Sequence, residues 1–264
     1  MFMVRKIFVC VWMTTLFFVG HESIAQKTLV SSEGTLKDKF SKKLGSLMLS
    51  ATALKFGRLK TNTTKMDTIR IFNSGNKPMS LSVAKVPDHL KVNLKSPVIE
   101  ANAESWITVA FDASKKNDFG FVLDRFDLVT NDSAMAKKII SITATLEEAF
   151  PVMTADDSLQ APRARWNETT FDFGSIRQGD KIHHDFVIQN DGKKDLVIHK
   201  TKSACGCIKT SFSKMTIAAG ESALVKVEYD SFGKEGKESR KLDVFLNDYI
   251  KPSVTIEMKG DVTK

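Results

Sequence analysis

The feature that most constrains the fold is an internal repeat. The segment LKFGRL returns as FDFGSI, so that Phe56-Gly57 matches Phe173-Gly174 at a spacing of 117 residues. A repeat of this length is too long for one unit of a solenoid and is typical of a duplicated domain. The chain is therefore expected to hold two copies of one fold.

Two turn signals recur at the same spacing. IRIFNSGNKPMSL lies over FVIQNDGKKDLVI, which matches Asn73 with Asn190 and Gly75 with Gly192. ANAES likewise meets AAGES, where Gly220 marks a turn between strands. Asn and Gly are turn residues because Asn bonds to nearby backbone and Gly tolerates left-handed conformations. We therefore expect these positions, with the Phe-Gly pairs, to be structural.

Within each copy the apolar residues alternate with period two, as in strands that bury one face. Turn signals separate these segments, and no helical stretch falls inside the repeats. The pattern predicts an all-β fold of two tandem immunoglobulin-like, seven-stranded β-sandwiches, over residues 50–146 and 166–264, joined by a linker over 147–165. The clearest alternating sets are Phe186, Ile188 and Asn190; Val225, Val227 and Tyr229; and Leu242, Val244 and Leu246.

The amino-terminal segment predicts export. Arg5 and Lys6 precede an apolar run, residues 7–19, and small residues lead up to Ala25. This order is typical of a secretory signal peptide over residues 1–25. The run is shorter than the roughly 20 residues that a membrane-spanning helix needs. We expect a protein of the periplasm or the cell surface that is not transmembrane.

The segment over residues 26–49 is expected to be amphipathic. In TLKDKFSKKLGSLML, residues 35–49, apolar residues fall at helical spacing, and Thr35 with Asp38 resembles a capping box. This predicts a short N-terminal helix that docks on the first sandwich. A helix that binds a membrane surface or a partner is the alternative.

The sequence SACGCIK contains the two cysteines, Cys205 and Cys207, that remain once Cys10 is removed with the signal peptide. An oxidising compartment favours a disulfide. A turn at Gly206 would shorten the distance between them, but so local a bridge would be strained and reducible. Three roles stay open: a structural disulfide, thiol redox chemistry, or capture of Cu or Zn with His199 as a further ligand.

Several function classes find no support in the sequence. It has no nucleophile elbow, zinc-protease, P-loop or dinucleotide motif, so we assign no catalytic residue and expect neither enzymatic activity nor a cofactor. The formal net charge is +8, but basic residues are interleaved with acidic ones and no aromatic ladder accompanies them. Nucleic-acid binding is therefore not expected. On the alternation, His184 points inward beside Phe186, and His183 points outward.

The second copy resembles a known family. The Phe-Gly pair, the Asn-x-Gly turn, the Cys-Gly-Cys loop and the Gly-Glu turn occur in order between Thr170 and about Val262. In this they resemble the bacterial domain-of-unknown-function family 1573, which has a Ser-Cys-Gly-Cys-Thr motif and immunoglobulin-like domains similar to Hydin, ASH and PapD-like sandwiches. This chain has Ala204 and Ile208 where the motif favours Ser and Thr, and its first copy has no cysteines. The resemblance implies an exported bacterial protein and supplies no established activity.

These observations favour a non-enzymatic binding or adaptor protein of the cell envelope. Its partner would be an envelope protein or surface component, held by exposed sheet edges that accept a strand or by loops at one end of a sandwich. The alternative function is periplasmic thiol redox or Cu/Zn handling by Cys205 and Cys207.

Overall fold

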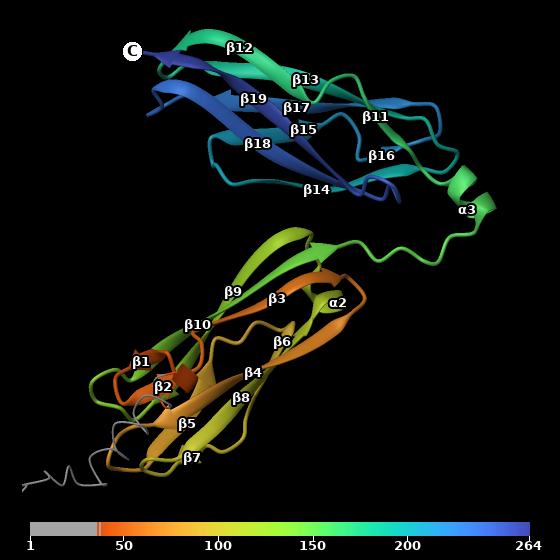
Figure 1. Ribbon diagram of the computed structural model, residues 1–264. Coiled ribbons are helices and arrows are strands. Elements are labelled where there is room, and N and C mark those ends of the chain that lie inside the picture. Colours follow the sequence, from red (N-terminus) through yellow and green to blue (C-terminus); the bar gives the residue numbers. More distant parts are fainter. Residues whose placement is uncertain (1–35, 37) are drawn as a thin grey trace, which may run out of the picture.

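The computed structural model describes residues 36 and 38–264 (Figure 1). The signal peptide expected over residues 1–25 lies outside this part of the chain, as do residues 26–35 of the segment that follows it. The described residues contain no helix with the length and apolar character needed to cross a membrane.

In the described part of the chain, the first sandwich has ten strands in two five-stranded sheets. Its elements are β1 (Lys42–Leu44), β2 (Leu47–Leu49), β3 (Ala53–Lys60), β4 (Thr64–Asn73), β5 (Met79–Ala84), β6 (Leu90–Leu94), β7 (Val98–Ile99), β8 (Glu104–Asp112), the short helix α2 (Ala113–Lys116), β9 (Gly120–Thr130) and β10 (Lys137–Glu147). The strand orders are β1-β2-β4-β8-β6 and β3-β10-β9-β5-β7.

The second sandwich pairs a four-stranded with a five-stranded sheet. Its elements, preceded by helix α3 (Ala155–Gln160), are β11 (Ala164–Trp166), β12 (Thr170–Arg177), β13 (Lys181–Asn190), β14 (Leu196–Ser203), β15 (Ile208–Phe212), β16 (Thr216–Ile217), β17 (Ser222–Asp230), β18 (Gly236–Leu246) and β19 (Ser253–Thr263). The strand orders are β11-β13-β17-β15 and β12-β19-β18-β14-β16. The prediction of an all-β fold with two tandem sandwiches is confirmed.

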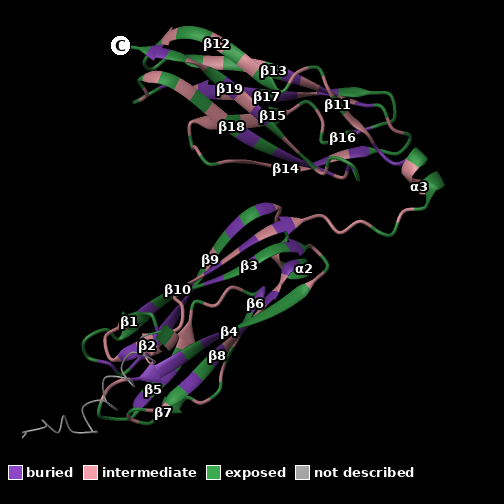
Figure 2. Cartoon of the chain, in the orientation of Figure 1, coloured by how far each residue is buried: buried purple, intermediate pink, exposed green. Residues whose placement is uncertain are grey.

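Each sandwich has its own core, and the buried residues alternate along the strands as expected (Figure 2). In β13, Phe186 and Ile188 are fully buried while their neighbours are partly exposed. His184 shares that face and meets the Phe186 ring edge-on at 4.7 Å, whereas the His183 side chain is 68% exposed. The two-residue alternation of apolar residues therefore predicted the inward face of β13 correctly.

The repeated Phe-Gly pair has the same structural task in both copies. Gly57 and Gly174 have φ angles of +72° and +69°, which a residue with a side chain rarely adopts. Each lies where the register of the edge strand shifts against its parallel neighbour, as in a β-bulge. The adjacent Phe173 stacks on buried Tyr229, with ring centroids 5.2 Å apart.

The structure corrects two expectations. Seven strands were predicted for each sandwich, whereas the described residues form ten in the first and nine in the second, because short strands such as β7 and β16 extend the sheets. The second correction concerns the N-terminal segment. Of the predicted helix over residues 35–49, the described residues are helical only at 36, 38 and 39, and β1 and β2 form a hairpin over residues 42–49. Gly45 has a φ of +66°, and the backbone N–H of Ser46 donates to the Asp132 carboxylate at 2.7 Å. Leu47 and Leu49 are fully buried in the first core. This long-range contact and burial, which local spacing does not encode, outweigh the helical pattern.

Candidate functional site

The Cys-Gly-Cys loop connects β14 in one sheet of the second sandwich to β15 in the other. Cys205 and Cys207 are joined by a disulfide, and their Cα atoms are 5.1 Å apart. That separation lies within the usual range for a bridged pair. The loop therefore crosses an end of the sandwich with its two cysteines linked.

Hydrogen bonds hold this loop on both sheets. The Ser203 hydroxyl donates to the Lys241 carbonyl at 3.0 Å and accepts from the Cys205 N–H at 3.2 Å. On the other sheet, the Asp230 N–H donates to the Cys207 carbonyl at 2.9 Å. Both cysteines are half-buried, and Cys207 packs against the second core.

Gly206, at the tip of the loop, is exposed, and a side chain there would meet nothing within 4 Å. Its φ lies outside the left-handed range. The local geometry therefore does not require glycine at this position.

Behind the loop lies a polar cluster that the sequence reasoning missed. Tyr229 pairs with Ile208 across the sheet and is fully buried, and its hydroxyl has no hydrogen-bond partner among residues 36 and 38–264. Glu238 and Arg240 form an ion pair on the inward side of β18. Burial raises the pKa of Tyr229, and the charge of Glu238 adds to this. The phenol is thus held neutral. In the sequence, Glu238 and Arg240 precede Leu242 at intervals of two residues and so lie on the same inward face of β18. This alternation is the signal that could have identified them.

The loop leads directly into an edge strand. Among the residues that the structure describes, β15 is the last strand of its sheet and pairs with β17 alone. Because the Asp230 N–H bonds to the Cys207 carbonyl and the Ser213 N–H to the Leu224 carbonyl, residues 209 and 211 direct their backbone groups toward β17. The backbone groups of Thr210 and Phe212 consequently face the open edge.

His199, the expected further metal ligand, takes part in a contact between the sandwiches. Its Nε2 lies 3.0 Å from a carboxylate oxygen of Glu148, and its ring stacks on Phe119 at 4.8 Å. In the described part of the chain, no three His, Cys, Asp or Glu side chains are grouped to hold a metal ion. The structure therefore does not assemble His199 with the two cysteines as such a group.

Asp118 completes this contact from the loop before β9. Its carboxylate lies 2.9 Å from the Lys200 ammonium and 3.0 Å from that of Lys202. Lys202 also donates to the Phe121 carbonyl at 3.0 Å. Burial opposes ionisation of Asp118, but the hydrogen bonds from both lysines outweigh it and lower its pKa. The ionised carboxylate thus joins the first sandwich to β14 of the second.

The remaining predicted positions are structural parts of the second sandwich. The Asn190 side chain is fully buried and bonds to four backbone groups, including the Gly192 N–H at 2.9 Å. Gly220 has a φ of +78° in the turn before β17, where the first copy places Asn102 at +56°. These residues lie outside the Cys-Gly-Cys loop and the β15 edge.

Fold and site together define a tandem immunoglobulin-like β-sandwich protein whose second sandwich carries a local disulfide beside a free edge strand. The family model described as "Protein of unknown function (DUF1573)" matches residues 164–262. The resemblance seen in the sequence is confirmed for this span. A comparison with curated proteins gave no match.

Solved structures support the fold. A protein of unknown function from Porphyromonas gingivalis W83 has a TM-score of 0.57 and 17% identity, over 82% of this chain and 100% of that one. At this identity the likeness shows the fold alone. PapD-like domain 7 of human CEP192 gives a TM-score of 0.34 and 10% identity over 45% of this chain and 94% of that one. The CupB2 chaperone of Pseudomonas aeruginosa has a TM-score of 0.28 and 13% identity, over 79% of this chain and 98% of that one.

Proposed function

We propose that this chain is an exported, non-enzymatic binding protein of the bacterial cell envelope, and that β15 of its second sandwich accepts an extended segment of a partner protein. The observation that carries the proposal is the open edge of β15. Its partner strand β17 lies on one side, and the backbone groups of Thr210 and Phe212 face away from it. An edge of this kind offers donors and acceptors in the register that a further strand needs.

The longer edge strands β3 and β12 are less suited to this task, and β6, the counterpart of β15 in the first sandwich, is equally long and unbroken but does not start from a disulfide-bridged loop. β3 and β12 each contain a register shift at a glycine with positive φ, and such a bulge interrupts the row of backbone groups. β15 pairs with β17 in unbroken register from Ile208 to Phe212. In addition, the disulfide fixes the loop from which β15 starts. A partner strand would therefore meet a preformed edge, which reduces the entropic cost of binding.

The test is capture of partners from the native envelope fraction by the wild-type chain and by Thr210→Pro. Proline removes the outward N–H of Thr210 and places a ring at the edge, while the ladder to β17 uses the neighbouring residues. We expect Thr210→Pro to lose the partners that the wild-type chain captures.

Thr210→Ala is the matched control, since it keeps the backbone donor, and it should capture the same partners as the wild type. The double variant Cys205→Ser, Cys207→Ser should also retain them. Capture by Thr210→Pro at the wild-type level, with an unchanged unfolding midpoint, would count against β15 as the acceptor edge.

A second candidate function is thiol redox or soft-metal handling by Cys205 and Cys207, and one observation favours it. The disulfide is half-exposed at the end of the sandwich, within reach of a dithiol donor. Reduction would take two electrons and two protons from that donor, leaving the donor as a disulfide and this chain with two thiols. Redox titration and Cu or Zn titration of the reduced chain test this function, with the double variant Cys205→Ser, Cys207→Ser as the control.

A further inference from the structure

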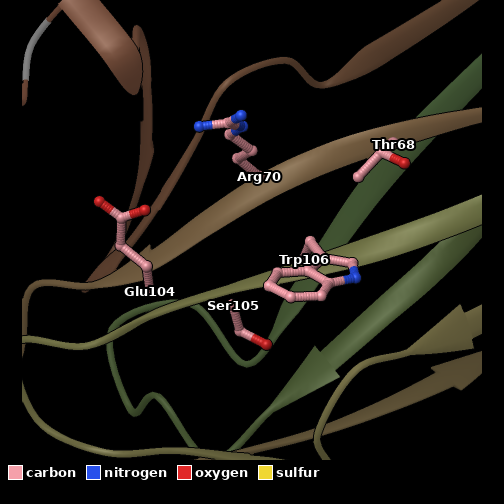
Figure 3. Close-up of a pocket in the computed structure, with 5 residues that line it drawn as sticks. All are labelled: Thr68, Arg70, Glu104, Ser105 and Trp106. Carbon is pink, nitrogen blue, oxygen red and sulfur yellow. The ribbon is translucent and has the colours of Figure 1, made fainter.

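A pocket lies on the outward face of the first sandwich, away from the β15 edge. It has a volume of about 520 Å³ and is lined by Thr68, Arg70, Glu104, Ser105 and Trp106. Thr68 and Arg70 project from β4, and the other three residues follow one another along β8 (Figure 3). This volume is in the range of small-molecule sites.

An exposed aromatic ring in the pocket lies beside two cations that lack acidic partners: Arg70, which lines the pocket, and Lys95, which does not line it but contacts the ring. Trp106 is 42% exposed, an unusual position for so large an apolar side chain. Arg70 is its direct cross-strand neighbour, and the Lys95 ammonium lies 3.6 Å from its ring centroid on the other side. Within the described chain, neither Arg70 nor Lys95 has a carboxylate within salt-bridge distance. Glu104, the one carboxylate that lines the pocket, is already bonded to Lys39 at 2.6 Å.

The duplication supplies an internal comparison. In the second sandwich, Val187 and Leu224 form the cross-strand pair that corresponds to Arg70 and Trp106. No exposed aromatic ring and no guanidinium stand there. The first copy therefore has two residues that the shared fold does not require, and they are placed next to each other.

The charges on the corresponding face of the second sandwich also differ. Lys226 lies 3.9 Å from the Asp185 carboxylate, and Lys209 lies 3.8 Å from that of Glu228. These lysines have acidic partners on their own surface. The unpaired cations beside Trp106 are thus a property of the first sandwich, and they favour an anionic ligand.

The position of the pocket indicates what kind of anion fits. β4 and β8 are internal strands whose backbone groups are paired on both sides, so an extended peptide would find no main-chain partners there. Recognition must use side chains: an indole, a guanidinium, an ammonium and the Thr68 hydroxyl. A sugar ring with a carboxylate matches this set, because its C–H face packs on an aromatic ring and its hydroxyls bond to polar side chains.

We propose that Arg70, Trp106 and Lys95 form a binding site for acidic oligosaccharides, in which uronate carboxylates of neighbouring sugars pair with the two cations and a sugar ring packs on the indole. Lys95 is exposed and has a flexible side chain, so a carboxylate draws its ammonium from the ring and uncovers the indole face. This site is separate from β15 and does not depend on the function proposed for that edge.

The test is calorimetric titration of the full chain with tetragalacturonate, beside neutral maltotetraose and a tetraglutamate peptide of equal charge number. We expect tetragalacturonate to bind at least about tenfold more tightly than either control, since only it supplies both charge and ring. Equal or tighter binding of tetraglutamate would overturn the assignment in favour of an acidic peptide. Absence of tetragalacturonate binding would also overturn it.

Variants locate the site. Arg70→Ala and Trp106→Ala should each weaken tetragalacturonate binding by about tenfold or more, because each removes one of the two recognised features. Lys226→Ala, on the corresponding face of the second sandwich, is the matched control and should bind as the wild type does. Arg70 is exposed, so Arg70→Ala should keep the wild-type unfolding midpoint. The Trp106 ring is more than half covered, so Trp106→Ala should lower the midpoint while still unfolding cooperatively well above the titration temperature, which separates loss of binding from loss of fold. Undiminished binding by Trp106→Ala would contradict the proposal.

Discussion

The side chains of Asn73 and Asn190 occupy the same buried position in the two sandwiches and share three corresponding hydrogen bonds. Asn73 Nδ2 donates to the Lys77 carbonyl and Asn190 Nδ2 to the Lys194 carbonyl, both at 2.8 Å. Each amide also reaches the chain 26 or 27 residues further on, at the Ile99 and Ile217 carbonyls. One side chain thus ties a tight turn to a distant strand in each copy.

We predict that Asn190→Ala destabilises the second sandwich substantially. Each buried group left without a partner costs about 1–3 kcal/mol in the free energy of unfolding, and this variant leaves several. Urea denaturation measures the change. Asn76→Ala, which removes an exposed amide, is the control and should be nearly neutral. Equal stability of both variants would contradict the structural role of Asn190.

The repeat and the alternation predicted the two sandwiches, because both follow from short-range sequence patterns that the backbone repeats. The hairpin of β1 and β2 was mispredicted, since its strands are short and Leu47 and Leu49 gain burial only from the folded core. The Asp132 contact with Ser46 spans 86 residues. No local pattern carries such information.

For the candidate site, the sequence identified the cysteines but not their surroundings. The Asp118 contact with β14 depends on how the two sandwiches meet, and the open edge of β15 depends on strand order. Neither is encoded at any single position. His199 was a reasonable ligand by residue type, but only the tertiary structure shows its contacts with Glu148 and Phe119.

The Cys205–Cys207 disulfide should contribute little to stability. A loop of about 15 residues gains about 3 kcal/mol from closure, and the ring closed here is far smaller. Reduction should therefore lower the unfolding midpoint only slightly, whereas Phe186→Ala, in the core, should cost about 3–5 kcal/mol. Thermal unfolding of the wild-type chain with and without reductant, and of Phe186→Ala beside it, measures the two effects. A loss on reduction as large as that of Phe186→Ala would show that the bridge holds the fold.

Two glycine substitutions should differ sharply. Gly206→Ala adds a methyl group into open space, so we expect less than about 1 kcal/mol of destabilisation. Gly192→Ala would bring its Cβ within 2.6 Å of the Pro162 backbone, which costs about 1–3 kcal/mol through overpacking. Chemical denaturation of the two variants gives the comparison. A larger loss for Gly206→Ala would mean that the loop geometry differs from the one described.

The contact between the sandwiches should weaken in acid. Docking lowers the pKa of Asp118 below its ordinary 3.8, so the docked state binds a proton less readily than the undocked state. The contribution of Asp118 to the stability of the docked state is therefore fully present above pH 3.8 and is lost as the pH falls through the lowered pKa. Small-angle scattering should show an increase in radius of gyration below about pH 4. Asp118→Asn should remove this part of the pH dependence, and an unchanged profile would assign the transition to other groups.

We propose that the two sandwiches fold as independent domains joined by residues 147–165. Val152 in this segment is fully exposed and Leu159 is 73% exposed. Limited proteolysis with thermolysin should cut there first, and each fragment should unfold cooperatively by itself. A protease-resistant core that spans both sandwiches, or a fragment that unfolds on separation, would contradict independence.

Amide hydrogen exchange at β15 tests the central claim most directly. In the free chain, the Thr210 and Phe212 amides face the open edge and should exchange rapidly, whereas those of Lys209 and Ser211, which point toward β17, should be protected. With the captured envelope partner bound, the account predicts that Thr210 and Phe212 become protected as a new strand pairs with them. Unchanged exchange at both amides in a complex that is otherwise formed would contradict strand acceptance at β15.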